Sequence, residues 1–254
     1  MNRIQRCFKA LAASVLTLML APAIATGSVL WSEDFEGFAT GDLPSQDSTW
    51  SYTNTAGISP WVDVGTRDGS QRVFVGGSTA SSANHSVTAQ KDLAAEFDTS
   101  ASQMEVSFVA ETNVGLPSQW GHQGAFRLWS GSDDLIAYIF FREQPTTGAV
   151  DGWFNDATIT FPTGTNDYRF GLDFVQQQAS LYINDVLIGQ EAFMSSVAPG
   201  DLAALDIEAG LFFPSAADRN TSVVVDDIVV IPEPGTVGLL AVGLGLLGLR
   251  RRRR

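Results

Sequence analysis

The stretch that decides the fold is MEVSFVAE, residues 104–111, in which apolar and polar side chains alternate. Successive side chains of a β-strand point to opposite faces of a sheet. Met104, Val106 and Phe108 would therefore share one face, and the residues between them would share the other. This pattern predicts a strand with one side in a core.

Comparable stretches recur along the chain and are divided by clusters of Gly, Asn, Asp or Pro. The predicted strands are 72–77, 85–93, 104–112, 124–131, 135–143, 152–161, 168–176, 179–189, 205–213 and 222–231. Asn184 and Asp185 stand between two apolar runs and predict a tight hairpin. The one expected helical turn is 198–205. So many short strands predict an all-β, antiparallel two-sheet jelly-roll sandwich.

The charge is distributed unevenly along the 254 residues. Eight of the 15 Lys and Arg residues lie in the first ten or last five positions. The body between them carries a formal charge of about −20, against −13 for the whole chain. Such a domain repels nucleic acid and anionic membranes, so nucleic-acid binding is excluded.

The first 25 residues have the layout of a secretory signal peptide. A basic segment is followed by the apolar ALAASVLTLMLAPA and by AIA, which predicts cleavage after Ala25. A membrane anchor is the alternative, but the apolar run is short and ends at Pro22. The single cysteine, Cys7, lies in this leader. The exported protein would therefore contain no disulfide, and a large core or a metal would have to stabilise it.

The last residues contain three consecutive signals. Pro232, Glu233 and Pro234 precede an apolar run over 235–249 with five glycines, and five arginines beginning with Arg250 and Arg251 end the chain. As a helix the run would span roughly 22 Å, which is short for a hydrocarbon core of about 30 Å. A plain tail anchor is one interpretation.

This tail resembles the PEP-CTERM sorting signal of exported proteins in Gram-negative bacteria. The resemblance implies recognition by an exosortase, which is a membrane transpeptidase, and a transient or retained insertion in the inner membrane. It also implies a place at the cell surface or in the extracellular matrix, in association with exopolysaccharide or biofilm. We therefore expect a signal peptide over 1–25, a β-sandwich domain over 26–231 and a sorting signal over 232–254.

The body resembles concanavalin A-like, or laminin-G-like, jelly-roll domains. WSEDFEGFATGDLPSQDSTW (residues 31–50) is similar to their first strand and loop, and VVVDDIVV (223–230) to their last strand. LYINDVLIG (181–189) is similar to a late hairpin, with Val186 where glycine is common. The resemblance implies two curved antiparallel sheets, which relatives use for carbohydrate binding, glycoside cleavage or adhesion.

Catalysis by paired carboxylates has one partial match. Laminarinase-like jelly rolls place their carboxylates as Glu-x-Asp-x-Glu on one strand, and retaining hydrolysis needs two of them. ALDIE, residues 204–208, supplies Asp206 and Glu208 but has Ala204 in the nucleophile position. We therefore predict that the protein is not an enzyme; a glycoside hydrolase or lyase with an unrecognised site is the rival hypothesis.

Calcium is the one cofactor that the sequence favours. His85 and His122 have no metal-ligand spacing, whereas calcium binds oxygen ligands. The resemblance implies that the first and last strands pair, which would bring together acids from both ends of the domain. The predicted calcium ligands are Glu33, Glu36, Asp226 and Asp227.

Sugar binding would use aromatic side chains that are flanked by polar groups. The body holds all six tryptophans, and Trp120 lies in a polar, glycine-rich loop with Gln119 and His122. These three residues, followed by Trp61 and Trp153, are the predicted ligand-binding residues, whereas Trp129 is expected in the core. The sequence thus predicts an exported, non-catalytic carbohydrate-binding jelly roll, with a purely structural surface protein as a second rival.

Overall fold

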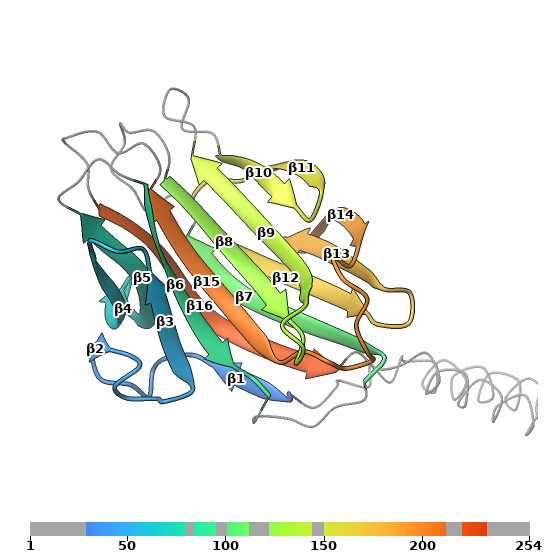
Figure 1. Cartoon of the computed structure of the whole chain (residues 1–254), viewed down its shortest axis with the longest axis horizontal. Helices are drawn as coiled ribbons and strands as arrows, with labels where there is room; N and C mark the ends of the chain where they lie inside the picture. The colour runs from blue at the N-terminus through green and yellow to red at the C-terminus, as the bar shows by residue number, and fades with distance from the viewer. Residues whose placement is uncertain are drawn as a thin grey trace, which may run out of the picture. The chain divides into compact units, whose positions relative to one another are not determined.

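A computed structural model describes residues 29–79, 84–94, 101–111, 122–143, 150–211 and 220–232. These residues form two antiparallel β-sheets that pack against each other (Figure 1). The architecture confirms the predicted all-β jelly-roll sandwich. The described part of the chain has no helical segment with the length and apolarity that a bilayer crossing requires. The predicted leader and the tail from Glu233 onward lie outside it.

Each sheet joins strands that are far apart in the sequence. Within the described residues, the nine-stranded sheet runs in the order β14 (Val186–Ala192), β13 (Gln178–Ile183), β12 (Thr165–Asp173), β7 (Gln103–Glu111), β16 (Asn220–Pro232), β5 (Ser70–Thr79), β4 (Ile58–Arg67) and β2 (Gly41–Asp42), with β1 (Trp31–Glu33) also on β16. The seven-stranded sheet runs β11 (Ala157–Phe161), β10 (Val150–Phe154), β9 (Leu135–Glu143), β8 (His122–Trp129), β15 (Ala204–Leu211), β6 (His85–Asp92) and β3 (Trp50–Asn54).

Residues with positive φ set several hairpin turns, and two of these turns bear on the predictions. The predicted hairpin joins β13 to β14, with Asn184 at φ 50° and Asp185 at φ 64°. A second hairpin corrects the prediction of one strand over 152–161, because β10 and β11 are separate strands that pair. Asn155 turns the chain there with φ 47°, a conformation that Asn adopts more easily than most residues.

The expected helical turn over 198–205 is wrong. The backbone N–H of Asp201 donates to the carbonyl of Ala198 at 3.2 Å, and that of Leu202 donates to the carbonyl of Gly200 at 2.9 Å. These bonds make a tight turn, and β15 begins directly afterwards at Ala204. Pro199 and Gly200 favour such a turn over a helix.

The last strand lies inside its sheet. One edge of β16 pairs with β7, and the other edge pairs first with β5 and then with β1 (Figure 1). The change of partner falls at a bulge between Asp226 and Val229, where Asp227 has φ 50°. The pairing of β1 with β16 confirms that the first and last strands meet.

The core follows the predicted alternation. Met104, Val106 and Phe108 are at most 2% exposed, and the Phe108 ring centroid lies 4.2 Å from that of Phe126 and 5.5 Å from that of Tyr168. Fully burying one such side chain contributes about 1.5–3 kcal/mol. A core of this kind can stabilise the domain without a disulfide.

The side chain of Lys91 points into the core between the two sheets. Lys91 is 2% exposed, and its Nζ lies 3.1 Å from Asp47 Oδ2. The same Nζ lies 5.1 Å from the ring centroid of Trp31 and 5.8 Å from that of Trp50. Burial acts to raise the pKa of Asp47, but hydrogen bonds from Thr49 and the Lys91 ammonium outweigh it and lower that pKa. The cluster ties β1 and the loop before β3 to β6.

Candidate functional site

An aromatic pair lies on the outer face of the seven-stranded sheet. Phe140 on β9 and Trp153 on β10 are directly opposite each other, with ring centroids 5.3 Å apart. Their strand neighbours Ile139 and Phe154 are buried in the core, so the pleat turns Phe140 and Trp153 outward. Both rings are partly exposed.

A charged pair lies beside these rings. Arg142 on β9 is opposite Asp151 on β10, and Arg142 Nε lies 3.5 Å from Asp151 Oδ1. The guanidinium carbon lies 5.8 Å from the ring centroid of Trp153. The two charged side chains are 40% and 36% exposed, so part of each is in contact with solvent.

A second ion pair lies on the same face of the sheet, on β8 and β15. Arg127 forms an ion pair with Glu208, and both side chains are partly exposed. Ala125 lies between Phe140 on one neighbouring strand and Glu208 on the other. Its short side chain is 1% exposed, so the neighbouring side chains cover it between the aromatic pair and the Arg127–Glu208 pair.

Asp206 on β15 lies opposite Arg127 and is more buried than the Arg127–Glu208 pair. It is 7% exposed, and its Oδ2 accepts a hydrogen bond of 2.7 Å from Trp129 Nε1. Burial raises the pKa of Asp206, and Glu208 adds to the rise, whereas Trp129, Arg127 and Gln90 act to lower it. Although Gln90 approaches the carboxyl group, Oδ1 has no partner with hydrogen-bond geometry among the described residues.

We name these side chains the outer strip. Its members are Arg127, Phe140, Arg142, Asp151, Trp153, Asp206 and Glu208, together with Trp129 and the buried Ala125. The expectation that Trp129 belongs to the core is wrong, because it alternates with buried Leu128 and its indole turns outward to Asp206.

The predicted ligand-binding residues do not gather at one place. Trp153 belongs to the outer strip, whereas Trp61 on β4 lies opposite Gly76 on the outer face of the nine-stranded sheet. The two tryptophans are therefore on opposite faces of the sandwich. His122 begins β8, but its side chain is not described, and Gln119 and Trp120 lie outside the described residues. The part of the prediction that rests on these three stays a prediction.

The predicted calcium ligands are divided among separate surroundings. Ser70 Oγ lies 2.8 Å from Glu36 Oε1 and 3.0 Å from Asp226 Oδ2, so these two acids meet at one hydroxyl. Arg72 Nε lies 3.3 Å from the same oxygen of Asp226 and supplies a positive charge there. Burial raises the pKa of Asp226, while hydrogen bonds from Gln71 and Ser70 lower the pKa of Glu36.

The other two acids lie elsewhere. Glu33 Oε1 accepts a hydrogen bond of 3.3 Å from the backbone N–H of Phe35, and burial raises the Glu33 pKa although Lys91 acts to lower it. Asp227 lines a hollow on the nine-stranded sheet. In the described part of the chain, no three His, Cys, Asp or Glu side chains form a group that could hold a metal ion. Calcium binding stays a prediction that rests on Glu36 and Asp226.

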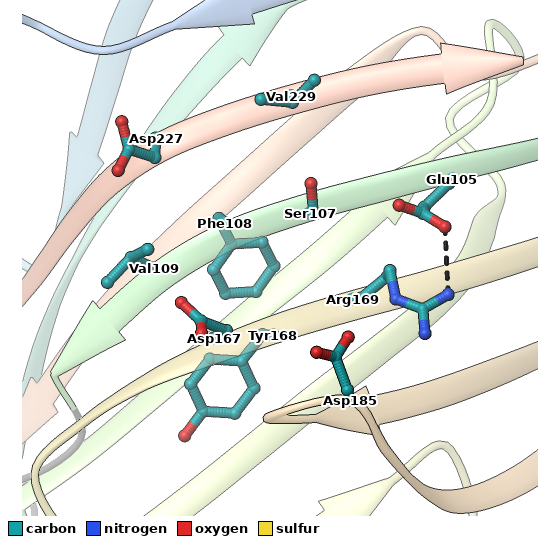
Figure 2. A pocket seen from close by; sticks show the side chains of 10 residues that line it. All are labelled: Glu105, Ser107, Phe108, Val109, Asp167, Tyr168, Arg169, Asp185, Asp227 and Val229. Atoms are coloured by element: carbon teal, nitrogen blue, oxygen red, sulfur yellow. Dashed lines mark hydrogen bonds and ion pairs between the residues drawn. The ribbon is translucent and has the colours of Figure 1, made fainter. Parts of the chain in front are cut away.

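That hollow has a volume of about 590 Å³ (Figure 2). The strands beneath the hollow line it with the short side chains of Ser107 and Val109 from β7 and of Val229 from β16. Arg169 on β12 pairs with Glu105 at 3.0 Å, and its guanidinium carbon lies 3.8 Å from the ring centroid of Tyr182. The remaining charged residues that line the hollow are the acids Asp167, Asp185 and Asp227, so its lining carries net negative charge.

The described chain ends at the first sorting residue. Pro232 is the last residue of β16 and pairs with Met104 of β7. Glu233, Pro234, Arg250 and Arg251 lie outside the described residues.

Several solved structures are similar in fold to the body. An endo-1,3-beta-glucanase from Streptomyces sioyaensis is similar with a TM-score of 0.55 and 11% identity, over 83% of this chain and 98% of that chain. The carbohydrate recognition domain of Emp47p is similar with a TM-score of 0.52 and 10% identity, over 82% and 97%. A sialidase gives a TM-score of 0.56 and 11% identity over 83% of this chain, but only 19% of the sialidase is covered. The body thus shares the jelly-roll fold of carbohydrate-recognition domains and glucanases.

The tail matches a known sequence motif. Residues 230–254 match the PEP-CTERM protein-sorting motif. The match confirms the resemblance drawn from Pro232, Glu233 and Pro234, and it implies export and exosortase processing. No curated protein is significantly similar in sequence to this chain.

Most of the outer strip was missed by sequence reasoning. The stretch LIAYIFFRE contains the signal, because buried Ile139 and Phe141 alternate with Phe140 and Arg142. The run is apolar on both faces, so alternation alone could not show which face meets solvent. The charged partners Arg127 and Glu208 lie 81 positions apart, and only sheet pairing brings them together.

Proposed function

We propose that the protein is an exported, non-catalytic carbohydrate-binding module and that a glycan binds along the outer strip. The observation that carries this proposal is the aromatic pair Phe140–Trp153, which is partly exposed beside two ion pairs. Binding sites for small ligands combine apolar and aromatic surface with a few placed polar groups. The sorting motif supports a place outside the inner membrane, where exopolysaccharide would be the accessible ligand.

The chemistry of the strip suits a pyranose ring. The C–H face of a sugar can stack on Trp153 or Phe140, which offer large apolar surfaces at low conformational cost. Hydroxyl groups that project from the sugar edge would then exchange hydrogen bonds with Glu208 and Arg127. Ala125 is buried between these two sides, so the sugar would lie across the exposed parts of the side chains that flank it.

The charge arrangement favours an uncharged glycan. Arg127 is paired with Glu208, and Arg142 is paired with Asp151, so these four charges cancel in pairs. A polyanionic glycan would meet no unpaired cation in the strip and would be repelled by the acidic body. We therefore expect affinity for neutral polysaccharide that changes little with ionic strength.

A glycoside hydrolase is the second candidate, and one observation favours it. Asp206 and Glu208 lie two positions apart on β15, and burial raises the pKa of Asp206, as in many catalytic acids. However, Ala204 leaves the strand without a third carboxylate, and Arg127 holds Glu208 in an ion pair. Incubation with a neutral β-glucan would separate the candidates: products that disappear in Glu208→Gln would establish an enzyme.

The test of binding compares two tryptophans on opposite faces. Purified residues 29–232, which contain the described core, are screened on a polysaccharide array, and each positive ligand is measured by calorimetry. We expect Trp153→Ala to weaken binding at least about tenfold, because truncation of a central aromatic contact commonly costs more than 1 kcal/mol. Trp61→Ala is the matched control and should leave the affinity unchanged.

The other outcomes are equally informative. Loss of binding in Trp61→Ala alone would move the site to the nine-stranded sheet and overturn the outer strip as the site. Absence of binding to every polysaccharide, including the exopolysaccharide of the source organism, would favour a purely structural surface protein.

A further inference from the structure

The sorting motif and the last strand share residues. The motif match begins at residue 230, whereas β16 extends to Pro232. Val230 pairs with Val106 on one side and with Trp31 on the other. Pro232, the first residue of Pro-Glu-Pro, pairs with Met104. No residue separates the folded sheet from the motif.

This overlap conflicts with what a peptide-processing enzyme needs. Such enzymes commonly bind their substrates as extended segments, with main-chain hydrogen bonds and pockets for alternate side chains. The main chain of residues 230–232 already has neighbours in the sheet, and the backbone N–H of Leu30 donates to the carbonyl of Val230 at 2.8 Å. Those residues cannot enter an enzyme groove while they remain paired.

The free energy needed to unpair β16 from its neighbours is low at Pro232 and higher at Val230. Ile231 and Pro232 are only half-buried at the strand end, and Pro232 has no N–H to lose from the ladder. Terminal residues of this kind unpair at low cost. Val230 is fully buried in the core and is flanked by strands on both sides, so it limits how far the end can open.

We infer that the exosortase can engage the Pro-Glu-Pro motif only after Ile231 and Pro232 leave the sheet, so that the folded body slows the processing of its own tail. Processing then depends on the stability of the end of β16. The body would remain folded during this step, because Val230 and the preceding strand keep their partners.

The test puts a spacer between the strand and the Pro-Glu-Pro tripeptide, which stays intact while Pro232 is removed from β16. Gly-Ser or Gly-Ser-Gly-Ser is inserted between Ile231 and Pro232 of the full chain, which is expressed together with the exosortase. Pulse–chase labelling then measures the half-time for conversion to the processed form. We expect the four-residue insert to shorten this half-time at least about threefold and the two-residue insert to have a smaller effect.

One control insertion and one further test variant accompany these inserts. The same tetrapeptide between Ala56 and Gly57, in the exposed turn between β3 and β4, should leave the half-time unchanged. Ile231→Gly loosens the strand end without lengthening the chain and should also shorten the half-time. Equal or longer half-times in both the insertion variants and Ile231→Gly would overturn the inference. Thermal unfolding and glycan binding of the same variants report separately on the fold and on the proposed function.

Discussion

At Gly152 the backbone of β10 approaches β9 so closely that no side chain fits. A Cβ added there would lie 1.8 Å from the carbonyl oxygen of Phe140 and 2.8 Å from Cα of Phe141. These are backbone atoms, so the clash cannot be relieved by a change of rotamer. The close approach matters because the next residue, Trp153, stands on the outer strip opposite Phe140.

Gly152→Ala should therefore displace β10 and disturb the aromatic pair. We expect a loss of about 1–3 kcal/mol in the free energy of unfolding, as is common for overpacked interiors, together with weaker glycan binding. Thermal and denaturant unfolding would measure the first effect, and calorimetry the second. Gly189→Ala is the matched control, because its Cβ would meet Phe154 at an ordinary 3.6 Å. Equal stability of the two variants would contradict the explanation.

At the scale of elements, β15 shows how one strand serves both the core and the surface. Leu205 and Ile207 are at most 1% exposed in the core, while Asp206 and Glu208 turn toward the outer strip. The neighbouring strands β8 and β6 enclose Asp206 so closely that its carboxyl group is nearly removed from water. Burial of a carboxyl group without full hydrogen bonding disfavours its charged form.

The pKa of Asp206 gives this strand a pH dependence. Because the pKa is higher in the folded protein than in the unfolded chain, its contribution to stability is fully present below the ordinary aspartate pKa of about 4. The contribution is lost as pH rises through the raised value. Asp206→Asn should remove that loss, so its melting temperature should vary less with pH from about 4 upward. Melting curves across pH would show this.

The control for this experiment is an aspartate outside the strip. Asp134→Asn, in the exposed turn before β9, should keep the pH profile of the unaltered protein. If Asp206→Asn and Asp134→Asn gave the same profile as the unaltered protein, Asp206 would not be the source of the pH dependence.

On the scale of the whole body, its two ends are tied together at β16. The short strand β1 pairs with β16, and the following loop brings Glu36 to Ser70 and Asp226. The Ser70 hydroxyl has one hydrogen for these two carboxylates. A bound cation could stabilise both acids at once, although Arg72 already offsets part of their charge.

Calcium is predicted to stabilise this junction of the two ends. A site occupied at a hundred times its Kd would add about 2.7 kcal/mol to the free energy of unfolding. We therefore expect the melting temperature in millimolar calcium to exceed that in chelator by several degrees, and Glu36→Gln to abolish the difference. Magnesium, which prefers a smaller octahedral site, is the control ion. Identical melting curves in calcium and chelator would contradict the prediction.

Local patterns determined much of this protein. The alternation around Phe108 established its buried face, Asn184 and Asp185 established a hairpin, and Pro-Glu-Pro with its tail established the sorting motif. These features depend on residues that are neighbours in the sequence, so a single stretch contains the whole signal. The strands β3 and β4 were not predicted, because Trp50–Asn54 and Ile58–Arg67 alternate too weakly to stand out.

Only the tertiary structure decided which side chains make up the proposed site. It placed Trp153 and Trp61 on opposite faces, turned Trp129 out of the core and joined Arg127 to Glu208. It also placed the first residue of Pro-Glu-Pro at the end of a paired strand. Alternation shows that two side chains lie on different faces of a strand, but it does not show which face meets water or which strand lies alongside. Those choices depend on pairing between distant segments, which no short stretch of sequence contains.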